Sequence, residues 1–283
     1  MKKSLYIILI IFVTSCYTDN NKINKNLISV SILPQKYFID QLAGNLLEVN
    51  VMIPPGANHA TYEPTPKQLA DISKSYMYVR MGEIIFEKVW MEKFLNNNTQ
   101  IKIINLAEDI ELIENFGHEH EHGDHHHDID PHIWMAPKKV QKMVDNLHKN
   151  LLKYYPEYAD TLNQNYTSFT SRISTLDSLY QQKTNALEQK NFIIFHPALT
   201  YMANDYGLNQ ISIELEGKEP SPVHLQKIID EAKALDIKYI FVQQEFNKEN
   251  AKAIAKEINA RIIEINPLGY NWEETMYDIL KNL

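Results

Sequence analysis

Residues 157–188 contain neither glycine nor proline, and this absence constrains the fold more than any other feature of the chain. Apolar and aromatic side chains recur along the stretch at the spacing of one helical face. A helix of about 30 residues would be about 45 Å long, which is longer than a small domain is wide. We therefore expect one long helix joining two domains; a coiled-coil dimerisation helix is the alternative, against which the short, tyrosine-rich periodic stretch argues. The side chains that set the period are Tyr158, Leu162, Tyr166, Phe169, Ile173, Leu176 and Tyr180.

Short β-rich runs alternate with helix-length segments on both sides of this stretch. Such alternation is typical of βα units that build a mostly parallel sheet. The predicted fold class is therefore α/β, with two βα domains, each holding a mostly parallel four-stranded sheet, joined by one long rigid helix. The strands are expected at residues 27–33, 46–53, 76–81 and 101–106, and again at 192–195, 210–215, 239–242 and 261–265.

The N-terminus has the pattern of an export signal. Lys2 and Lys3 precede an apolar run, residues 5–13, that is too short to span a bilayer. The next residues, Val13-Thr-Ser-Cys16, resemble the lipobox of bacterial lipoproteins, in which the cysteine becomes the lipid-modified first residue. Cys16 is the only cysteine, so an intramolecular disulfide is excluded. The alternative is an ordinary secretory signal with an incidental cysteine.

The mature chain is expected to be acidic and to hold two domains. Without the first sixteen residues roughly 265 remain, which is enough for two ordinary domains. Loss of Lys2 and Lys3 takes the formal charge from −8 to about −10, which argues against nucleic acid or an anionic membrane surface as a partner. The expected divisions are a signal peptide (1–16), a polar tether (17–26), an N-terminal α/β domain (27–137) with a His-rich loop (118–130), a helical section with the linking helix (138–188), and a C-terminal α/β domain (189–283).

Residues 118–132 read HEHEHGDHHHDIDPH and contain seven of the eleven histidines of the chain. Neutral imidazole is a common ligand of zinc, and the interleaved carboxylates add oxygen ligands. We interpret the first ten residues as an accessory, metal-capturing segment that is dispensable for the fold and for the tightest site. A solvated polar loop or an expression tag is the alternative. The histidines of this segment are His118, His120, His122, His125, His126 and His127.

The last histidine of the run, His132, has a different setting. It follows Pro131, whose fixed φ stiffens the chain, and it precedes the apolar residues Ile133 and Trp134. This pattern indicates that the loop re-enters the folded protein at His132. We therefore expect His132 to be a metal ligand in its own right.

Two other histidines lie where strands of the predicted sheets end. His59 comes shortly after the second expected strand, and His196 closes the Phe192–Phe195 strand. In open α/β sheets, ligands bind outside the carboxyl ends of the strands. His59 and His196, one from each domain, are therefore candidate metal ligands. His132 joins them from the start of the helical middle section. His148 and His224 lie on predicted helices, and we interpret them as ordinary exposed residues.

Three segments carry a family resemblance: Gly56–Pro66 (GANHATYEPTP), Asp130–Pro137 (DPHIWMAP) and Phe195–Leu208 (FHPALTYMANDYGL). They resemble the zinc- and manganese-binding solute-binding proteins of bacterial metal ABC importers (cluster A-I, or family 9), and the likeness extends over essentially the whole mature chain. It implies metal binding by His59, His132 and His196 in a cleft between the domains, and delivery of the ion to the transmembrane subunit of an ABC permease. It also implies a non-enzymatic, monomeric lipoprotein held by a lipid anchor at Cys16, in the periplasm or on the outer cell surface.

The residue types favour zinc as the cargo. Relatives that look manganese-specific place a carboxylate where His196 stands, which gives two imidazoles and two carboxylates. Oxygen-rich sites suit manganese and imidazole-rich sites suit zinc, so Zn²⁺ is expected and Mn²⁺ is the less favoured ion. A manganese-binding homologue remains an alternative.

The fourth ligand is left open by the sequence. The family usually carries Asp-Pro-Leu-Gly in its last strand–helix turn, whereas this chain has Asn266-Pro-Leu-Gly269. The fourth position is therefore Asn266, a water, or an acid such as Glu63 or Glu245. Three histidines and a water also hold catalytic zinc, so a zinc hydrolase is a rival function, although the chain has no HExxH motif. A surface adhesin built on the same fold is a second rival.

Overall fold

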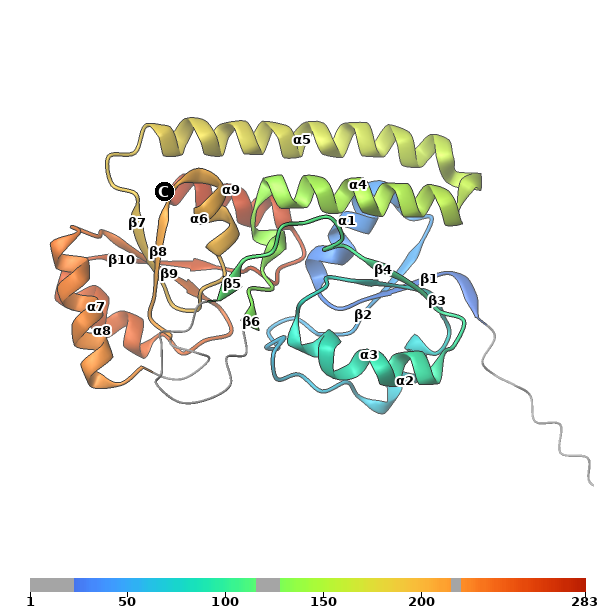
Figure 1. The fold of residues 1–283 in the computed structure, drawn as a ribbon, viewed down its shortest axis with the longest axis horizontal. Coiled ribbons are helices and arrows are strands. Elements are labelled where there is room, and N and C mark those ends of the chain that lie inside the picture. Colours follow the sequence, from blue (N-terminus) through green and yellow to red (C-terminus); the bar gives the residue numbers. More distant parts are fainter. Residues whose placement is uncertain (1–22, 116–127, 215–219) are drawn as a thin grey trace, which may run out of the picture.

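The computed structural model describes residues 23–115, 128–214 and 220–283. Two lobes, each built on a four-stranded sheet, lie side by side, and the long helix α5 (Ala159–Asn185) runs along both of them (Figure 1). Every strand pair within the two four-stranded sheets is parallel, which confirms the predicted fold class. In the ranges described, no helix has the length and apolar character needed to cross a membrane.

The N-terminal lobe contains a sheet of strand order β2-β1-β3-β4. Its first strand begins at Asn24, so residues 24–26, expected in the tether, belong to the sheet. The polar side chains there are tolerated because only the backbone is needed: the amide of Asn24 donates to the carbonyl of Lys74, and the Tyr155 hydroxyl donates to the carbonyl of Lys25, each at 2.8 Å. The elements are β1 (Asn24–Val30), α1 (Leu33–Ala43), β2 (Glu48–Val51), α2 (Pro66–Ile72), β3 (Ser75–Arg80), α3 (Ile85–Asn97) and β4 (Lys102–Asn105).

The C-terminal lobe repeats this plan with strand order β10-β9-β7-β8. Ser221 caps α7 by accepting a hydrogen bond from the amide of His224, as its position before Pro222 predicts. Gly207 ends α6 in the left-handed conformation, which glycine adopts without strain. The elements are β7 (Asn191–Ile194), α6 (Thr200–Tyr206), β8 (Asn209–Ser212), α7 (Pro222–Ala234), β9 (Tyr239–Gln243), α8 (Glu249–Ile258), β10 (Arg261–Ile265) and α9 (Trp272–Asn282).

The segment between the sheets forms the connection of the two lobes. A short antiparallel pair, β5 (Glu114–Asn115) and β6 (Asp128–Ile129), was not predicted from the sequence; it lies between the two sheets (Figure 1). A 3₁₀ turn, η1 (Ile133–Met135), leads into α4 (Pro137–Tyr154), and a second one, η2 (Pro156–Tyr158), leads into α5. The long helix predicted without glycine or proline is thus confirmed, and Pro156 marks the corner before it.

One continuous apolar core crosses the boundary between the lobes. It includes Phe38 from α1, Phe169 from α5, Phe192 from β7 and Trp272 from α9. A second, smaller cluster lies within the C-terminal lobe and includes side chains of α7 and α8. Because the larger core is shared, burial of apolar surface holds both lobes against the same helices.

Two tryptophans connect the segment that follows His132 to the C-terminal lobe through hydrogen bonds. The indole nitrogen of Trp134 donates to the carbonyl of Pro267 at 2.8 Å, and that of Trp272 donates to the carbonyl of Trp134 at 2.6 Å. Both side chains are almost fully buried. Buried indoles satisfied in this way bring the loop between β10 and α9 against the His132 segment.

Candidate metal centre

His59 is presented by a tight turn that follows β2. The side chain of Asn58 accepts a hydrogen bond from the amide of Ala60 at 2.7 Å, and its carbonyl accepts from the amide of Tyr62 at 3.0 Å. This local pairing satisfies the backbone of the turn without a neighbouring strand. His59 itself is buried, and its Nδ1 has no hydrogen-bond partner among the described residues. A buried nitrogen without a partner is unusual in a folded protein, and its free lone pair can bind a metal ion.

His132 is held in place by Asp130. One carboxylate oxygen of Asp130, Oδ1, lies 2.8 Å from both the backbone amide and the ring Nδ1 of His132. Burial raises the pKa of Asp130, but the charge and hydrogen bonds of His132 outweigh it and hold that pKa below its usual value. Burial lowers the pKa of His132, which favours the neutral ring. In the neutral ring the carboxylate selects the tautomer with the proton on Nδ1, which leaves the lone pair of Nε2 available for a metal.

His196 has a matching arrangement in the other lobe. Its Nδ1 lies 2.8 Å from Oε2 of Glu214, and its Nε2 is buried without a hydrogen-bond partner in the described part of the chain. The side chain of Gln243 bonds to both backbone groups of His196, at 3.2 Å and 2.6 Å. The ring of Phe246 stacks on the imidazole, with centroids 5.1 Å apart. Glu214 therefore holds the edge of the imidazole, Phe246 covers its face, and Gln243 fixes the backbone of the residue.

The three imidazoles converge from two lobes and the connecting segment. One nitrogen from each of His59, His132 and His196 lies within 4.8 Å of the other two. Nitrogens bound at 2.0–2.1 Å around a tetrahedral ion would be about 3.4 Å apart, so a small contraction would complete the site. Among the described His, Cys, Asp and Glu side chains, this is the group that could hold an ion. Sequence positions 59, 132 and 196 therefore meet at one point.

Comparisons with known proteins show the family to which the chain belongs. The family profile of ZnuA, described as zinc-uptake complex component A, periplasmic, matches residues 28–283. The protein belongs to the ZnuA family. The family resemblance predicted from the sequence is thereby confirmed.

Individual relatives of this ZnuA-family chain cover most of its length. The high-affinity zinc uptake system protein ZnuA of Bacillus subtilis is 30% identical over 266 residues, which cover 90% of this chain and 82% of that protein. The zinc-binding lipoprotein AdcA of Streptococcus pneumoniae R6 is 29% identical and matches 93% of this chain, but the chain spans only about half (54%) of that protein's length. A crystal structure of ZnuA superposes with a TM-score of 0.83 at 34% identity, covering 90% of this chain and 96% of that one.

The three residues proposed for the fourth position are placed differently. Glu63 is exposed in the loop before α2, and neither it nor Glu245 belongs to the three-histidine group. Glu245 lies after β9 beside His196, where burial raises the pKa of its carboxyl group and His196 partly opposes that shift. Asn266 is half-buried in the loop that Trp134 holds through Pro267. The fourth ligand therefore stays a prediction among these residues and water.

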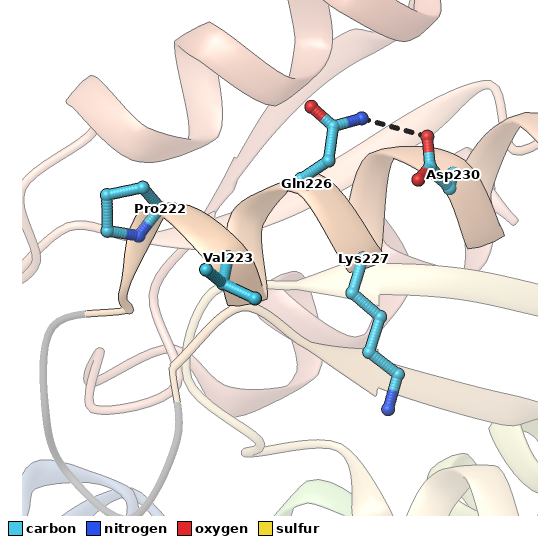
Figure 2. A pocket seen from close by; sticks show the side chains of 5 residues that line it. All are labelled: Pro222, Val223, Gln226, Lys227 and Asp230. Carbon is cyan, nitrogen blue, oxygen red and sulfur yellow. Dashed lines mark hydrogen bonds between the residues drawn. The ribbon is translucent and has the colours of Figure 1, made fainter.

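Several other candidate residues lie elsewhere. Cys16 and the six histidines between 118 and 127 fall outside the described residues. His148 and His224 were expected to be exposed, but both are half-buried; His148 stacks on Tyr166 at a centroid distance of 4.0 Å because α4 packs on α5 there. A surface hollow at the start of α7 contains none of the three clustered histidines (Figure 2).

Sequence reasoning missed the two carboxylates that orient the histidines. Asp130 was read only as part of its motif, and Glu214 was not singled out. The signal for Asp130 is its i, i+2 spacing to a histidine in a proline-stiffened loop. Glu214 is eighteen residues from His196, and only the pairing of β7 with β8 brings the two together.

The stability of the metal-free protein is expected to fall as the pH is lowered from 6.5. Burial, followed by the neighbouring His132 and His196, lowers the pKa of His59 to about 3. The unfolded chain protonates this residue near pH 6.5. Between these values the unfolded state binds one more proton, so the free energy of unfolding drops by up to about 1.4 kcal/mol per pH unit as the pH is lowered. Above pH 6.5 this group does not affect the free energy of unfolding.

Denaturant titrations in the presence of a chelator at pH 7.5 and 5.5 measure the effect. The His59→Asn variant should show a shallower dependence, and equal slopes for the two proteins would contradict the assignment.

Proposed function

We propose that this protein captures zinc outside the cytoplasm and delivers it to the transmembrane subunit of an ABC permease. The observation that carries the proposal is the convergence of three imidazoles, two of them oriented by carboxylates, between two lobes that share a rigid core. The relatives named for zinc uptake and zinc binding support the same cargo. In this proposal His59, His132 and His196 bind the ion.

The chemistry of the site favours zinc over manganese. Each of the three clustered side chains offers a nitrogen, and imidazole nitrogen suits zinc, whereas manganese prefers oxygen ligands. Three nitrogens leave one position of a tetrahedron for Asn266, Glu245, Glu63 or water. The match to a family of zinc-uptake components and the lack of an HExxH motif in the sequence support a binding protein rather than an enzyme.

The setting of the protein completes the proposal. The export signal and lipobox support lipid attachment at Cys16, which would keep the protein at a membrane surface in the periplasm or on the outer face of the cell. We propose that it acts as a monomer there. The six histidines between 118 and 127 would raise the local zinc concentration without forming part of the tight site.

Metal analysis of the purified protein tests whether the three-histidine site binds zinc tightly and the segment 118–127 binds it more weakly. Three proteins are compared: the wild type, a deletion of 118–127, and a matched control in which the six histidines of that segment become asparagine. We expect each to retain one tightly bound zinc, while the two variants lose any weaker zinc binding. Manganese outcompeting zinc at the wild-type cleft would refute the zinc assignment, and loss of all tight binding in both variants would refute the three-histidine cleft.

The rival functions give different results in simple assays. An adhesin would bind host matrix, and that binding would survive replacement of His196. A zinc hydrolase would show turnover that disappears when the metal is removed.

A further inference from the structure

The hydroxyl of Tyr201 joins three segments that are distant in the sequence. It lies on α6, accepts a hydrogen bond from the amide of Ile113 at 3.0 Å, and donates one to the carbonyl of Asp130 at 2.8 Å. The amide of Asp130 in turn donates to the carbonyl of Ile113 at 2.9 Å. The phenol therefore closes a ring of three hydrogen bonds where the chain enters and leaves the β5–β6 pair.

Asp130, a member of this ring, lies two residues before the proposed metal ligand His132. Asp130, whose carbonyl takes the phenol proton, uses its carboxylate to hold both the amide and the ring of His132. A shift of the Asp130 backbone would carry that carboxylate with it. The position of the His132 imidazole thus depends on the hydrogen bond from Tyr201.

The same tyrosine is tied to the ligand from the other lobe. His196 is five residues earlier, and the turn between them is fixed by the amide of Ala198, which donates to the carbonyl of His196 at 2.7 Å. The amide of Leu199 donates to the side chain of Gln210 at 2.9 Å. Tyr201 is itself fully buried, so its ring has little freedom to move. Its hydroxyl consequently sets the spacing between the His132 and His196 segments.

We propose that Tyr201 is a positioning residue of the zinc site, which holds the Asp130–His132 pair in register with His196 through its hydroxyl group. This inference rests on the proposed function. Burial raises the pKa of Tyr201 to about 12, so the hydroxyl keeps its proton and remains a donor at physiological pH. Partners that orient a metal-bound histidine typically change metal affinity by 10–100-fold, and Tyr201 acts through such a partner.

Tyr180 offers a matched control. It is another fully buried tyrosine, and its hydroxyl also donates to a backbone carbonyl, that of Met276 at 2.6 Å. It contacts neither Asp130 nor the three histidines through its hydroxyl. Tyr201→Phe and Tyr180→Phe therefore each remove a buried hydroxyl that donates to a backbone carbonyl. Only Tyr201→Phe removes the hydrogen bond to Asp130.

The test measures zinc affinity of full-length protein, solubilised in detergent, by competition with a chelator. We expect Tyr201→Phe to bind zinc about 10-fold more weakly than the wild type, and Tyr180→Phe to bind it equally well while losing similar thermal stability. The absorption bands of bound cobalt(II) report ligand geometry directly, and they should change only in Tyr201→Phe. Wild-type zinc affinity and cobalt spectrum in Tyr201→Phe would overturn the inference, as would equal losses of affinity in both variants.

A measurement on the wild type covers the case in which Tyr201→Phe does not fold. Coupling between two sites is reciprocal, so zinc binding should in turn tighten the hydrogen bonds of Tyr201. The amide of Ile113 should exchange with solvent more slowly in zinc-loaded than in metal-free protein. The amide of Asn98, which caps the C-terminal end of α3 in the N-terminal lobe and donates to the carbonyl of Phe94, serves as the reference. Unchanged exchange at Ile113 overturns the inference alone. Wild-type protein that binds no zinc overturns the proposed function, and the inference with it.

Discussion

Replacement of His132 by alanine is expected to weaken zinc binding by more than about 100-fold. Outer partners of metal-bound histidines are worth 10–100-fold, and loss of the ligand itself should cost more. His132 is a proposed ligand, and Asp130 holds it through both its amide and its ring. The substitution removes one of the three imidazoles, and it leaves the buried Asp130 carboxylate without the ring nitrogen that it contacts. Isothermal titration or chelator competition with zinc measures the change.

His148→Ala is the matched control for this prediction. His148 is a half-buried histidine on α4 that bonds to Asn163 and stacks on Tyr166, and it does not belong to the three-histidine group. This variant should bind zinc as the wild type does. If His132→Ala retained wild-type affinity, the ion would have to be held elsewhere, and the segment 118–127 would be the next place to search.

Replacement of Trp272 by alanine is expected to lower the free energy of unfolding by about 3–5 kcal/mol. The side chain is 1% exposed and packs edge-to-face on Phe38 of the N-terminal lobe, with ring centroids 5.6 Å apart. Its indole also donates to the carbonyl of Trp134, so the substitution creates a cavity and removes a buried hydrogen bond between the lobes. Guanidinium denaturation of the metal-free protein measures the loss.

Trp90→Ala provides the comparison for Trp272. Trp90 is half-buried on α3, with the Lys93 ammonium group 3.9 Å from its ring centroid, and its substitution should cost only about 1–2 kcal/mol. Because the core is shared between the lobes, we expect one cooperative transition in the wild type. Equal losses for the two tryptophans would show that the contact between the lobes contributes little to stability.

Much of the fold follows from local patterns in the chain. The strand at Arg261–Ile265 has the predicted bounds, and α5 lies within the stretch that lacks glycine and proline. These elements were predictable because hydrophobic periodicity, proline and glycine act within a few residues of one another. The short β5–β6 pair was not predicted, because two residues on each side carry too little periodicity to recognise.

The candidate metal centre shows most clearly what depends on the sequence and what depends on the tertiary structure. The sequence by itself determined the residue types and the three positions, 59, 132 and 196, because imidazoles next to strand ends and a proline-stiffened loop are visible in one dimension. Only the tertiary structure decided that the three nitrogens meet within 4.8 Å, that Glu214 orients His196, and that Tyr201 links His132 to the other lobe. Each of these contacts joins residues far apart in the chain, and their distances depend on how the strands pair and how two lobes pack on one helix. Such pairing is set by the whole core and cannot be read from neighbouring residues.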